Sequence, residues 1–242
     1  MAVRIAIVNS SSFGRIFPDH MGKLKQLGEV NRFDLPKDME GKELARELMG
    51  YSIIITSVTP LYNKEFFDYK DKTFLIARHG IGYNNIDVEA ATKKGTFITI
   101  VDAGVERESV AENAVALLMT VIRQTALASK EVKEGKWSER AKFVGYEIKD
   151  KIVGVIGFGN IGSRVGEILK NGFNAKLIAY DPYLRDEEIE KRGAQPVSLE
   201  VLLKNADIVS LNSILNGSTY HMISEKSFAI MKKGVFIVNA AR

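Results

Sequence analysis

Gly157, Gly159 and Gly162 have the spacing of a loop that binds the phosphates of a dinucleotide. They follow an apolar run at residues 152–156 and open a helical pattern that reaches Leu169. In a strand, turn and helix of this kind, the first glycine permits a tight turn and the second lets the backbone approach a pyrophosphate. The third lets the helix pack on the strand, and the helix N-terminus faces the anion. The sequence therefore predicts a dinucleotide site.

An acidic residue follows the next expected strand, at the distance of a ribose ligand. Residues 177–180 are followed by Asp181, which lies 19 positions after Gly162 (181 − 162 = 19), near the expected spacing of about 20. A carboxylate there accepts hydrogen bonds from ribose hydroxyls and repels a 2′-phosphate, so we expect NAD rather than NADP. The alternative is that the glycines form ordinary turns and that Asp181 caps the following segment.

The composition limits the classes of function. The chain has 242 residues, 45% of them hydrophobic, which allows one large domain or two small ones. It has no cysteine, which excludes disulfides, a thiolate zinc site and a cysteine nucleophile, and no metal site is expected. The net charge is only +4, and basic and acidic residues alternate, as at residues 130–134, so a nucleic-acid partner is not expected. No apolar stretch resembles a signal peptide or a membrane span, and we expect a cytoplasmic protein.

Residues 1–100 alternate short apolar runs with helical patterns, which is typical of parallel strands joined by crossover helices. The expected strands lie at residues 3–8, 30–33, 52–56, 74–77 and 97–100, and the expected helices at residues 21–27, 42–49 and 88–94. The pattern predicts an α/β unit of its own, flavodoxin-like in strand order.

A polar segment without periodicity, residues 102–108, indicates a hinge between two domains. Ser109 and Glu112 follow it with the Ser-x-x-Glu spacing of a capping box, which predicts a long helix from Ser109 towards Gly135. The capping box also accounts for Glu112 without a catalytic role. An irregular segment at residues 137–146 is expected after this helix.

We expect the domains to be residues 1–101 and residues 102–242. In the second domain, further strands are expected at residues 195–197, 207–211 and 235–238. A charged helix is expected to end at Gly193, and a second helix to span residues 199–204. A third helix is expected to begin after an N-cap at Ser224 and to end with the cations before Gly234. The total is five strands, whereas a dinucleotide-binding sheet usually has six, in the order 3-2-1-4-5-6. We therefore expect an α/β Rossmann domain that is incomplete at its C-terminal side.

Several segments together resemble the NAD-dependent D-2-hydroxyacid dehydrogenases, the family of phosphoglycerate, glycerate, formate and D-lactate dehydrogenases. The resemblance spans nearly the whole chain and is carried by residues 77–87 (ARHGIGYNNID), 109–113 (SVAEN), 135–137 (GKW), 157–162 (GFGNIG) and 231–242 (MKKGVFIVNAAR). It implies a substrate domain followed by an NAD-binding domain. It also implies hydride transfer between nicotinamide and a small D-2-hydroxy or 2-oxo acid in a cleft between them.

The resemblance implies roles for individual residues. The backbone N–H groups of His79, Gly80 and Ile81 would bind the substrate carboxylate. Arg242 would be catalytic, because its guanidinium would hold the substrate and polarise the C=O bond. The cofactor contacts would be Val110 and Ala240–Ala241 around the nicotinamide and its ribose, Asn160 and Ile161 at the pyrophosphate, and Ser213, Ile214 and Thr219 along the cofactor.

The sequence departs from the family pattern in two ways. Asn212 stands where histidine is common and Ile214 where proline is common, so the loop shape or cofactor affinity is expected to differ there. The family's acid/base histidine and its carboxylate partner follow the arginine that matches Arg242, which is the last residue here. We therefore expect a piece of a longer enzyme, truncated at the catalytic arginine, with impaired turnover. His79 is a possible substitute donor, although a backbone turn explains its place without chemistry.

Three functions are compatible with the sequence. The first is an NAD-dependent D-2-hydroxyacid dehydrogenase. The second is a non-catalytic NAD(H)-sensing module, as in the family's transcriptional co-repressor branch. The third is a sister reaction on formate, phosphite or a phosphorylated acid. The resemblance also implies a homodimer, with the helix from Ser109 and residues 137–146 at the contact.

Overall fold

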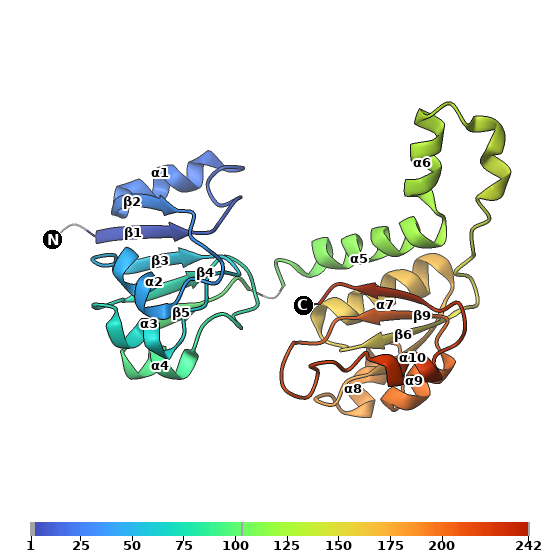
Figure 1. Cartoon of the computed structure of the whole chain (residues 1–242). Coiled ribbons are helices and arrows are strands. Elements are labelled where there is room, and N and C mark those ends of the chain that lie inside the picture. The colour runs from blue at the N-terminus through green and yellow to red at the C-terminus, as the bar shows by residue number, and fades with distance from the viewer. Residues whose placement is uncertain (1–2, 103, 242) are drawn as a thin grey trace. The chain divides into compact units, whose positions relative to one another are not determined.

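The structure is a computed structural model that describes residues 3–102 and 104–241 (Figure 1). The chain divides into two compact units, residues 1–102 and residues 103–242, which we call unit 1 and unit 2. Each unit has a parallel sheet with apolar side chains packed on both faces.

Unit 1 contains a five-stranded parallel sheet in the order β2-β1-β3-β4-β5, which confirms the flavodoxin-like order. The strands are β1 (Val3–Val8), β2 (Gly28–Phe33), β3 (Ile53–Thr56), β4 (Leu75–Arg78) and β5 (Phe97–Thr99). The helices are α1 (Pro18–Leu27), α2 (Gly41–Glu47), α3 (Lys64–Tyr69) and α4 (Val88–Lys93). Side chains of α2, α3 and α4 pack on one face of the sheet, and those of α1 on the other.

Helix α3 is absent from the sequence-based prediction. It has only six residues, and the Asn63 side chain caps it by accepting a hydrogen bond from the Phe66 amide at 3.0 Å. The helix buries Phe66 and Phe67 beside Tyr62, whose hydroxyl donates to the Thr56 hydroxyl at 3.0 Å. Burial raises the pKa of the Tyr62 hydroxyl above its ordinary value.

Unit 2 contains a second five-stranded parallel sheet, in the order β10-β9-β6-β7-β8. Its strands are β6 (Ile152–Ile156), β7 (Lys176–Tyr180), β8 (Gln195–Pro196), β9 (Ile208–Leu211) and β10 (Phe236–Asn239). Numbered within the unit, the order is 5-4-1-2-3, which matches five strands of the Rossmann arrangement. The α/β fold and the Rossmann topology of the second half are therefore confirmed.

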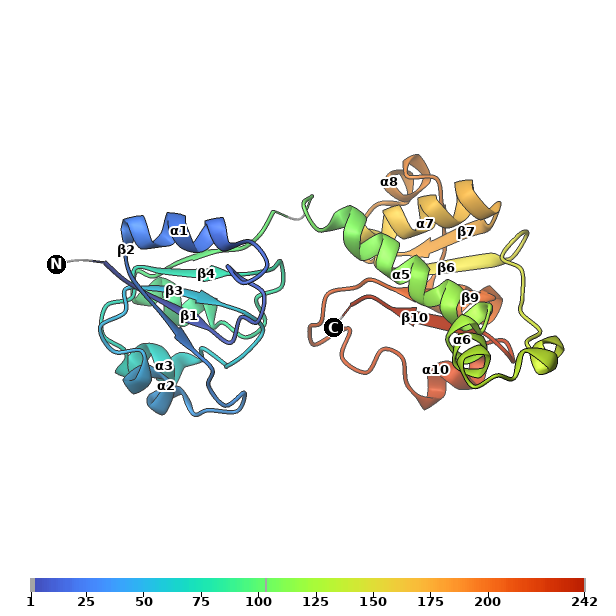
Figure 2. The same ribbon diagram turned by 90° about the horizontal axis from the view of Figure 1, so that it is seen from above.

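The helices of unit 2 cover both faces of its sheet (Figure 2). They are α5 (Arg107–Ile122), α6 (Thr125–Lys133), α7 (Asn160–Phe173), α8 (Asp186–Lys191), α9 (Leu199–Asn205) and α10 (Glu225–Ile230), with a 3-10 helix η1 at Trp137–Lys142. Helix α5 buries Ala111, Ala114 and Leu118 against α7 and the sheet. Helix α9 buries Leu202 and Leu203 on the opposite face.

The predicted helix from Ser109 towards Gly135 is wrong in two respects. Helix α5 begins at Arg107 with Glu106 as N-cap, and the Ser109 hydroxyl donates to the Glu106 carbonyl at 3.2 Å instead of capping. A serine in the first turn can bond back to a carbonyl in this way, so the motif alone did not define the cap. The helix also stops at Ile122, because Gln124 adopts a left-handed conformation with φ of 54° before α6 begins.

Helix α10 is shorter than predicted. Ser224 is its N-cap, as expected, but the helix ends at Ile230. Lys232 therefore lies beyond its last turn, and the Lys232 Nζ pairs with Asp207 Oδ1 at 2.8 Å. Burial opposes ionisation of Asp207, but Lys232 and the Ile152 amide outweigh it and hold the pKa of this carboxyl below its ordinary value.

Substitution of Gly154, in β6, tests whether α9 packs against the sheet without space for a side chain at this position. A Cβ atom at this position would lie 2.6 Å from Leu202 Cδ2 and 3.0 Å from Ala206 Cβ. We expect Gly154→Val to lower the free energy of unfolding by about 1–3 kcal/mol through overpacking. Gly172→Ala in α7 is the control, because a Cβ there meets nothing within 4 Å. We expect unchanged or slightly higher stability for it. Equal losses in thermal melts of both variants would contradict the packing argument.

Candidate functional site

The three glycines of the predicted dinucleotide motif have different steric environments. Gly157 has φ of +82°, and a Cβ on it would lie 2.7 Å from the Ser213 amide nitrogen. A Cβ on Gly162 would lie 2.0 Å from the Gly157 carbonyl oxygen. A Cβ on Gly159 would meet nothing within 4 Å. The first and third glycines therefore permit close packing within the protein, whereas the second leaves open space in front of the turn.

Helix α7 begins at this turn, with Gly159 as its N-cap. Its first turn contains no acidic residue that would compete with an anion. Phe158, between the two glycines, is fully buried in the core of unit 2. The buried Phe158 side chain thus anchors the glycine turn to the core. The N-terminal amides of α7 lie at the same turn, and amides at a helix N-terminus are the groups that bind a pyrophosphate.

Asp181 lies directly after β7 and is tied to the glycine turn. Its Oδ2 accepts a hydrogen bond from the Phe158 amide at 2.8 Å, and its Oδ1 accepts one from the Tyr183 amide at 2.9 Å. The capping alternative is therefore realised in part, because Asp181 does hold the segment that follows it. A carboxylate has about four lone-pair sites, so both oxygens can still accept from ribose hydroxyls.

A cavity of about 310 Å³ lies beside the turn. Among the predicted cofactor residues, those that line it are Gly157, Gly159, Asn160, Asp181, Ser213, Ile214 and Thr219. The structure thus brings together residues from the ends of β6, β7 and β9, which meet at the carboxyl edge of the sheet. That edge is where doubly wound sheets bind dinucleotides.

The loop after β9 forms one wall of the cavity and is organised by Asn216. The Asn216 side-chain oxygen accepts from the amides of Ser218 at 2.9 Å and Thr219 at 3.1 Å. Its Nδ2 donates to the hydroxyl of Tyr183, which lines the cavity, at 3.2 Å. Asn212 keeps its side chain within this region by donating to the Ser210 hydroxyl at 3.0 Å.

Several predicted cofactor residues do not line this cavity. Gly162 is buried beneath the turn, and Ile161 and Ala240 are half-buried and pack on the core of unit 2. Val110 is half-buried in the first turns of α5, and the Ala241 amide donates to Asn239 Oδ1 at 2.9 Å. Their cofactor roles stay predictions. The predicted catalytic residue Arg242 lies outside the described residues.

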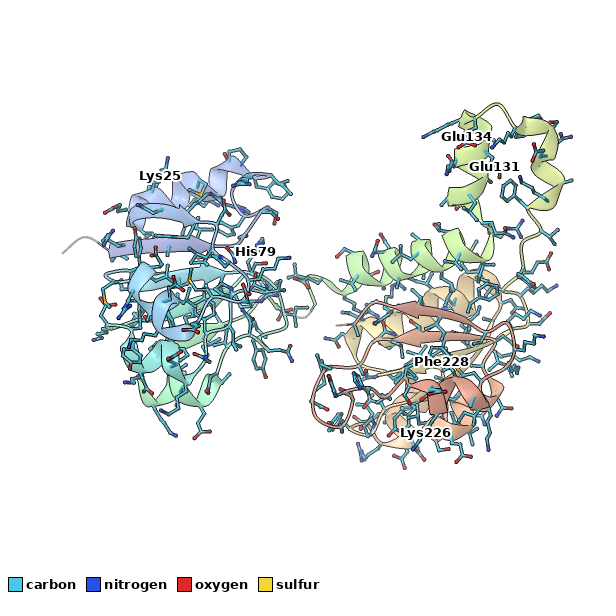
Figure 3. All side chains as sticks on the ribbon, viewed as in Figure 1. Lys25, His79, Glu131, Glu134, Lys226 and Phe228 are labelled. Atoms are coloured by element: carbon cyan, nitrogen blue, oxygen red, sulfur yellow. The ribbon has the colours of Figure 1, made fainter. Side chains whose placement is uncertain are left out.

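The predicted substrate loop, residues 79–81, follows β4 in unit 1 (His79 is labelled in Figure 3). The His79 amide donates to the Thr56 carbonyl at 2.8 Å, and the Gly80 amide donates to the Arg78 carbonyl at 2.9 Å. A carboxylate would therefore compete with these acceptors. The His79 Nδ1 lies 3.1 Å from the Ser10 hydroxyl, which brings the ends of β1 and β4 together.

Sequence reasoning missed three polar residues around the cavity. Tyr183 and Arg192 line it, and Arg192 Nη1 donates to the Phe158 carbonyl at 2.6 Å. Asn216 holds the loop after β9, as described above. Tyr183 and Asn216 each follow the end of a predicted strand by a few residues, and this position is the signal in the sequence that could have indicated them. Arg192 has no such signal, because only the fold brings the end of α8 back to the turn.

The match to a family model identifies the class of protein. Residues 115–242 match the NAD-binding domain of the D-isomer specific 2-hydroxyacid dehydrogenases. The chain belongs to this family, and unit 2 contains its NAD-binding domain. The resemblance inferred from the motifs, and NAD as the cofactor of the family, are thereby confirmed.

Individual relatives agree with this assignment. The chain is 34% identical over 225 residues to a glyoxylate reductase of Thermococcus litoralis, covering 90% of this chain and 67% of the relative. It is 37% identical over 205 residues to a D-3-phosphoglycerate dehydrogenase of Archaeoglobus fulgidus, covering 84% of this chain but only 38% of the relative.

A solved D-lactate dehydrogenase of Aquifex aeolicus, in complex with NAD and lactic acid, has a similar fold. Its TM-score is 0.82 at 28% identity, over 98% of this chain and 69% of that one.

Within residues 3–102 and 104–241, no helix is long and apolar enough to cross a membrane. The same residues contain no group of three or more His, Cys, Asp or Glu side chains that could hold a metal ion.

The open space at Gly159 leads to a prediction about cofactor binding. We expect Gly159→Ala to leave the melting temperature unchanged, because a Cβ meets nothing there, and to weaken NADH binding about tenfold or more by blocking the pyrophosphate. Calorimetric titration and thermal melts measure the two effects. Gly162→Ala, whose Cβ would clash with the Gly157 carbonyl, should lower both stability and affinity. Wild-type NADH affinity in Gly159→Ala would contradict the assignment.

Asp181 leads to a second prediction, on cofactor choice. We expect Asp181→Asn to weaken NADH binding and to reduce the preference for NADH over NADPH by about tenfold, because the charge that repels a 2′-phosphate is removed. The ratio of the two dissociation constants measures this effect. Asp186→Asn is the matched control, since Asp186 is an exposed acid in the first turn of α8. An unchanged ratio in Asp181→Asn would exclude Asp181 as the selective group.

Proposed function

We propose that the protein to which this chain belongs transfers a hydride between NAD(H) and a small D-2-hydroxy or 2-oxo acid. The observation that carries the proposal is the glycine turn with Asp181 around one cavity, in a domain of this family. The named relatives, a glyoxylate reductase and a phosphoglycerate dehydrogenase, support the same substrate class.

In this proposal unit 1 supplies the backbone contacts to the substrate, and unit 2 supplies the cofactor contacts and Arg242. The backbone of residues 79–81 binds the substrate carboxylate. Among the described residues, the Ile81 amide donates to no backbone carbonyl, unlike the His79 and Gly80 amides. Arg242 polarises the substrate C=O bond as the hydride arrives at its carbon. Asn160 and Ile161 would hold the pyrophosphate at the N-terminus of α7. NAD supplies the hydride chemistry when bound.

Turnover and binding are tested separately. NADH oxidation by the protein to which this chain belongs is followed with glyoxylate, hydroxypyruvate and pyruvate, and NADH binding is measured by calorimetry in parallel. We expect NADH binding and oxidation that depends on a 2-oxo acid, with Gly159→Ala as the binding-deficient control. Binding without oxidation of NADH by any of these acids would contradict catalysis and favour the NAD-sensing alternative. No binding would contradict both.

Arg242 is tested by substitution. We expect Arg242→Gln to lower kcat/KM by about 10²-fold or more, because the group that stabilises charge on the substrate oxygen is lost. NADH affinity should stay unchanged. Arg185→Gln removes an equally large cation from an exposed position before α8 and should leave kcat/KM unchanged. Wild-type kcat/KM in Arg242→Gln would exclude the proposed role.

We also propose that the protein is a homodimer. Residues 123–146, which we call the arm, include α6 and η1, and these two helices stand apart from the sheet of unit 2 (Figure 1). No residue of α6 or η1, all of them described, is buried. Lys142 links the two helices by pairing with Glu131 at 2.5 Å and Glu139 at 2.9 Å (Glu131 is labelled in Figure 3). The two helices of the arm are joined by ion pairs and bury no core residue, which supports the proposal that a second copy of the chain packs on them.

The arm exposes apolar side chains that a second copy would cover. Trp137 is 61% exposed, Val144 69% and Tyr146 60%. We expect Trp137→Glu and Val144→Glu to shift the chain from dimer to monomer in light scattering after size-exclusion chromatography. Phe228→Glu is the control, because Phe228 is 55% exposed on α10, away from the arm (Figure 3). A monomeric wild type, or dimers in both arm variants, would contradict the proposal.

A cytoplasmic location stays a prediction.

A further inference from the structure

The peptide group between Gly80 and Ile81 is held through its carbonyl. The Gly80 carbonyl accepts a hydrogen bond from the amide of Val101, shortly after β5, at 3.1 Å. The C=O and N–H of a trans peptide point in opposite directions, so the Ile81 N–H points away from Val101. This amide donates to no backbone carbonyl among the described residues. Its direction therefore depends on how His79 and Gly80 are held.

Arg78 is the last residue of β4 and directly precedes this loop. Burial alternates along the strand, so Ile76 and Arg78 point to the same face of the sheet, where Ile76 joins the core packed by α2, α3 and α4. Arg78 is 4% exposed. The Nη1 of its guanidinium donates to the His79 carbonyl. The guanidinium thus holds the first peptide group of the loop from inside the protein.

Gly80 brings the same guanidinium into contact with the next residue of the loop. Gly80 is buried and has φ of +140°, a conformation that favours glycine. A Cβ on Gly80 would lie 2.5 Å from Arg78 Nη1 and 3.0 Å from Arg78 Cζ. The guanidinium therefore packs where a side chain at position 80 would lie. Arg78 contacts two consecutive loop residues, His79 by a hydrogen bond and Gly80 by packing.

The chemistry of arginine distinguishes these contacts from ordinary packing. A guanidinium stays protonated in proteins, so Arg78 is a buried charge, which is unfavourable unless its donors are used. An apolar side chain of similar length would fill the same space without that cost, but it could not donate to the His79 carbonyl. The position of the charge therefore favours a role in orienting the loop over a role in filling the core.

We propose that Arg78 is a positioning residue for the substrate. It holds the His79 carbonyl and packs on Gly80, and it thereby sets the direction of the Ile81 amide, which donates to the substrate carboxylate. Arg78 acts only through the loop, because its own side chain is buried. The inference rests on the proposed function of residues 79–81 and adds the residue that keeps this loop in its binding conformation.

The test compares Arg78→Met and Arg78→Lys in the protein to which this chain belongs. Two quantities are measured: KM for the 2-oxo acid, and the dissociation constant of oxamate, an unreactive carboxylate analogue, with NADH bound. We expect both to rise about tenfold in Arg78→Met, because the carboxylate loses an oriented donor. The rise should be smaller in Arg78→Lys, which keeps a charged donor without the planar fork. The kcat and the NADH affinity should stay unchanged.

Arg4→Gln is the control for a general loss of stability. Arg4 lies at the amino edge of the same sheet, where the strands begin, and it donates to the Tyr51 hydroxyl at 2.9 Å and pairs with Glu29 at 3.3 Å. We expect this variant to lower the melting temperature and to leave KM and oxamate affinity unchanged. If Arg78→Met does not fold, the rise in Arg78→Lys decides the question.

The outcomes separate this inference from the proposed function. Wild-type KM and oxamate affinity in the Arg78 variants, or an equal rise in Arg4→Gln, would overturn the role of Arg78 and leave the proposed reaction intact. A wild type that binds oxamate but oxidises no NADH would contradict the reaction alone, and the oxamate affinities of the variants would still decide the role of Arg78. A wild type that binds no oxamate would overturn both.

Discussion

The nucleotide-binding unit depends on a close approach of backbone segments at the glycine turn. A Cβ on Gly162 would lie 2.0 Å from the Gly157 carbonyl oxygen. A Cβ on Gly157 would lie 2.7 Å from the Ser213 amide nitrogen. The turn therefore meets both α7 and the loop after β9 at distances that only glycine permits. This approach points the N-terminus of α7 into the cavity and brings Ser213 to its wall. A side chain at either position would separate elements that together form the site.

The peptide groups of Phe158 connect this packing to the chemistry of the site. Asp181 accepts from the Phe158 amide at 2.8 Å, and Arg192 donates to its carbonyl at 2.6 Å. The residue between the two glycines is thus held through its ring, its N–H and its C=O. The same contact fixes the Asp181 carboxylate, so the proposed ribose ligand is oriented by the protein before a cofactor arrives. Such preorganisation lowers the entropy lost on binding.

Sequence patterns predicted the fold class and most strands because buried parallel strands leave continuous apolar runs, such as β1 and β6. They missed α3, which has six residues and too few turns for a helical period. They also missed the break at Gln124, since the helical pattern continues across it. In the candidate site, motif spacing identified Gly157, Gly159 and Asp181. Arg192 reaches the site only through tertiary folding, which local pattern does not encode.

The two edges of the sheet in unit 1 are unlike in a way that bears on function. At the carboxyl edge, the His79 and Gly80 amides already donate to backbone carbonyls, and the His79 ring meets the Ser10 hydroxyl. At the amino edge, the Lys70 side chain is 1% exposed and the buried Thr73 hydroxyl has no hydrogen-bond partner among the described residues, so neither group reaches a ligand in solvent. A ligand at the carboxyl edge meets His79 and Gly80 amides that must first release their carbonyl partners, which weakens the contact. A substrate carboxylate at the carboxyl edge therefore requires a second contact such as the one proposed for Arg242.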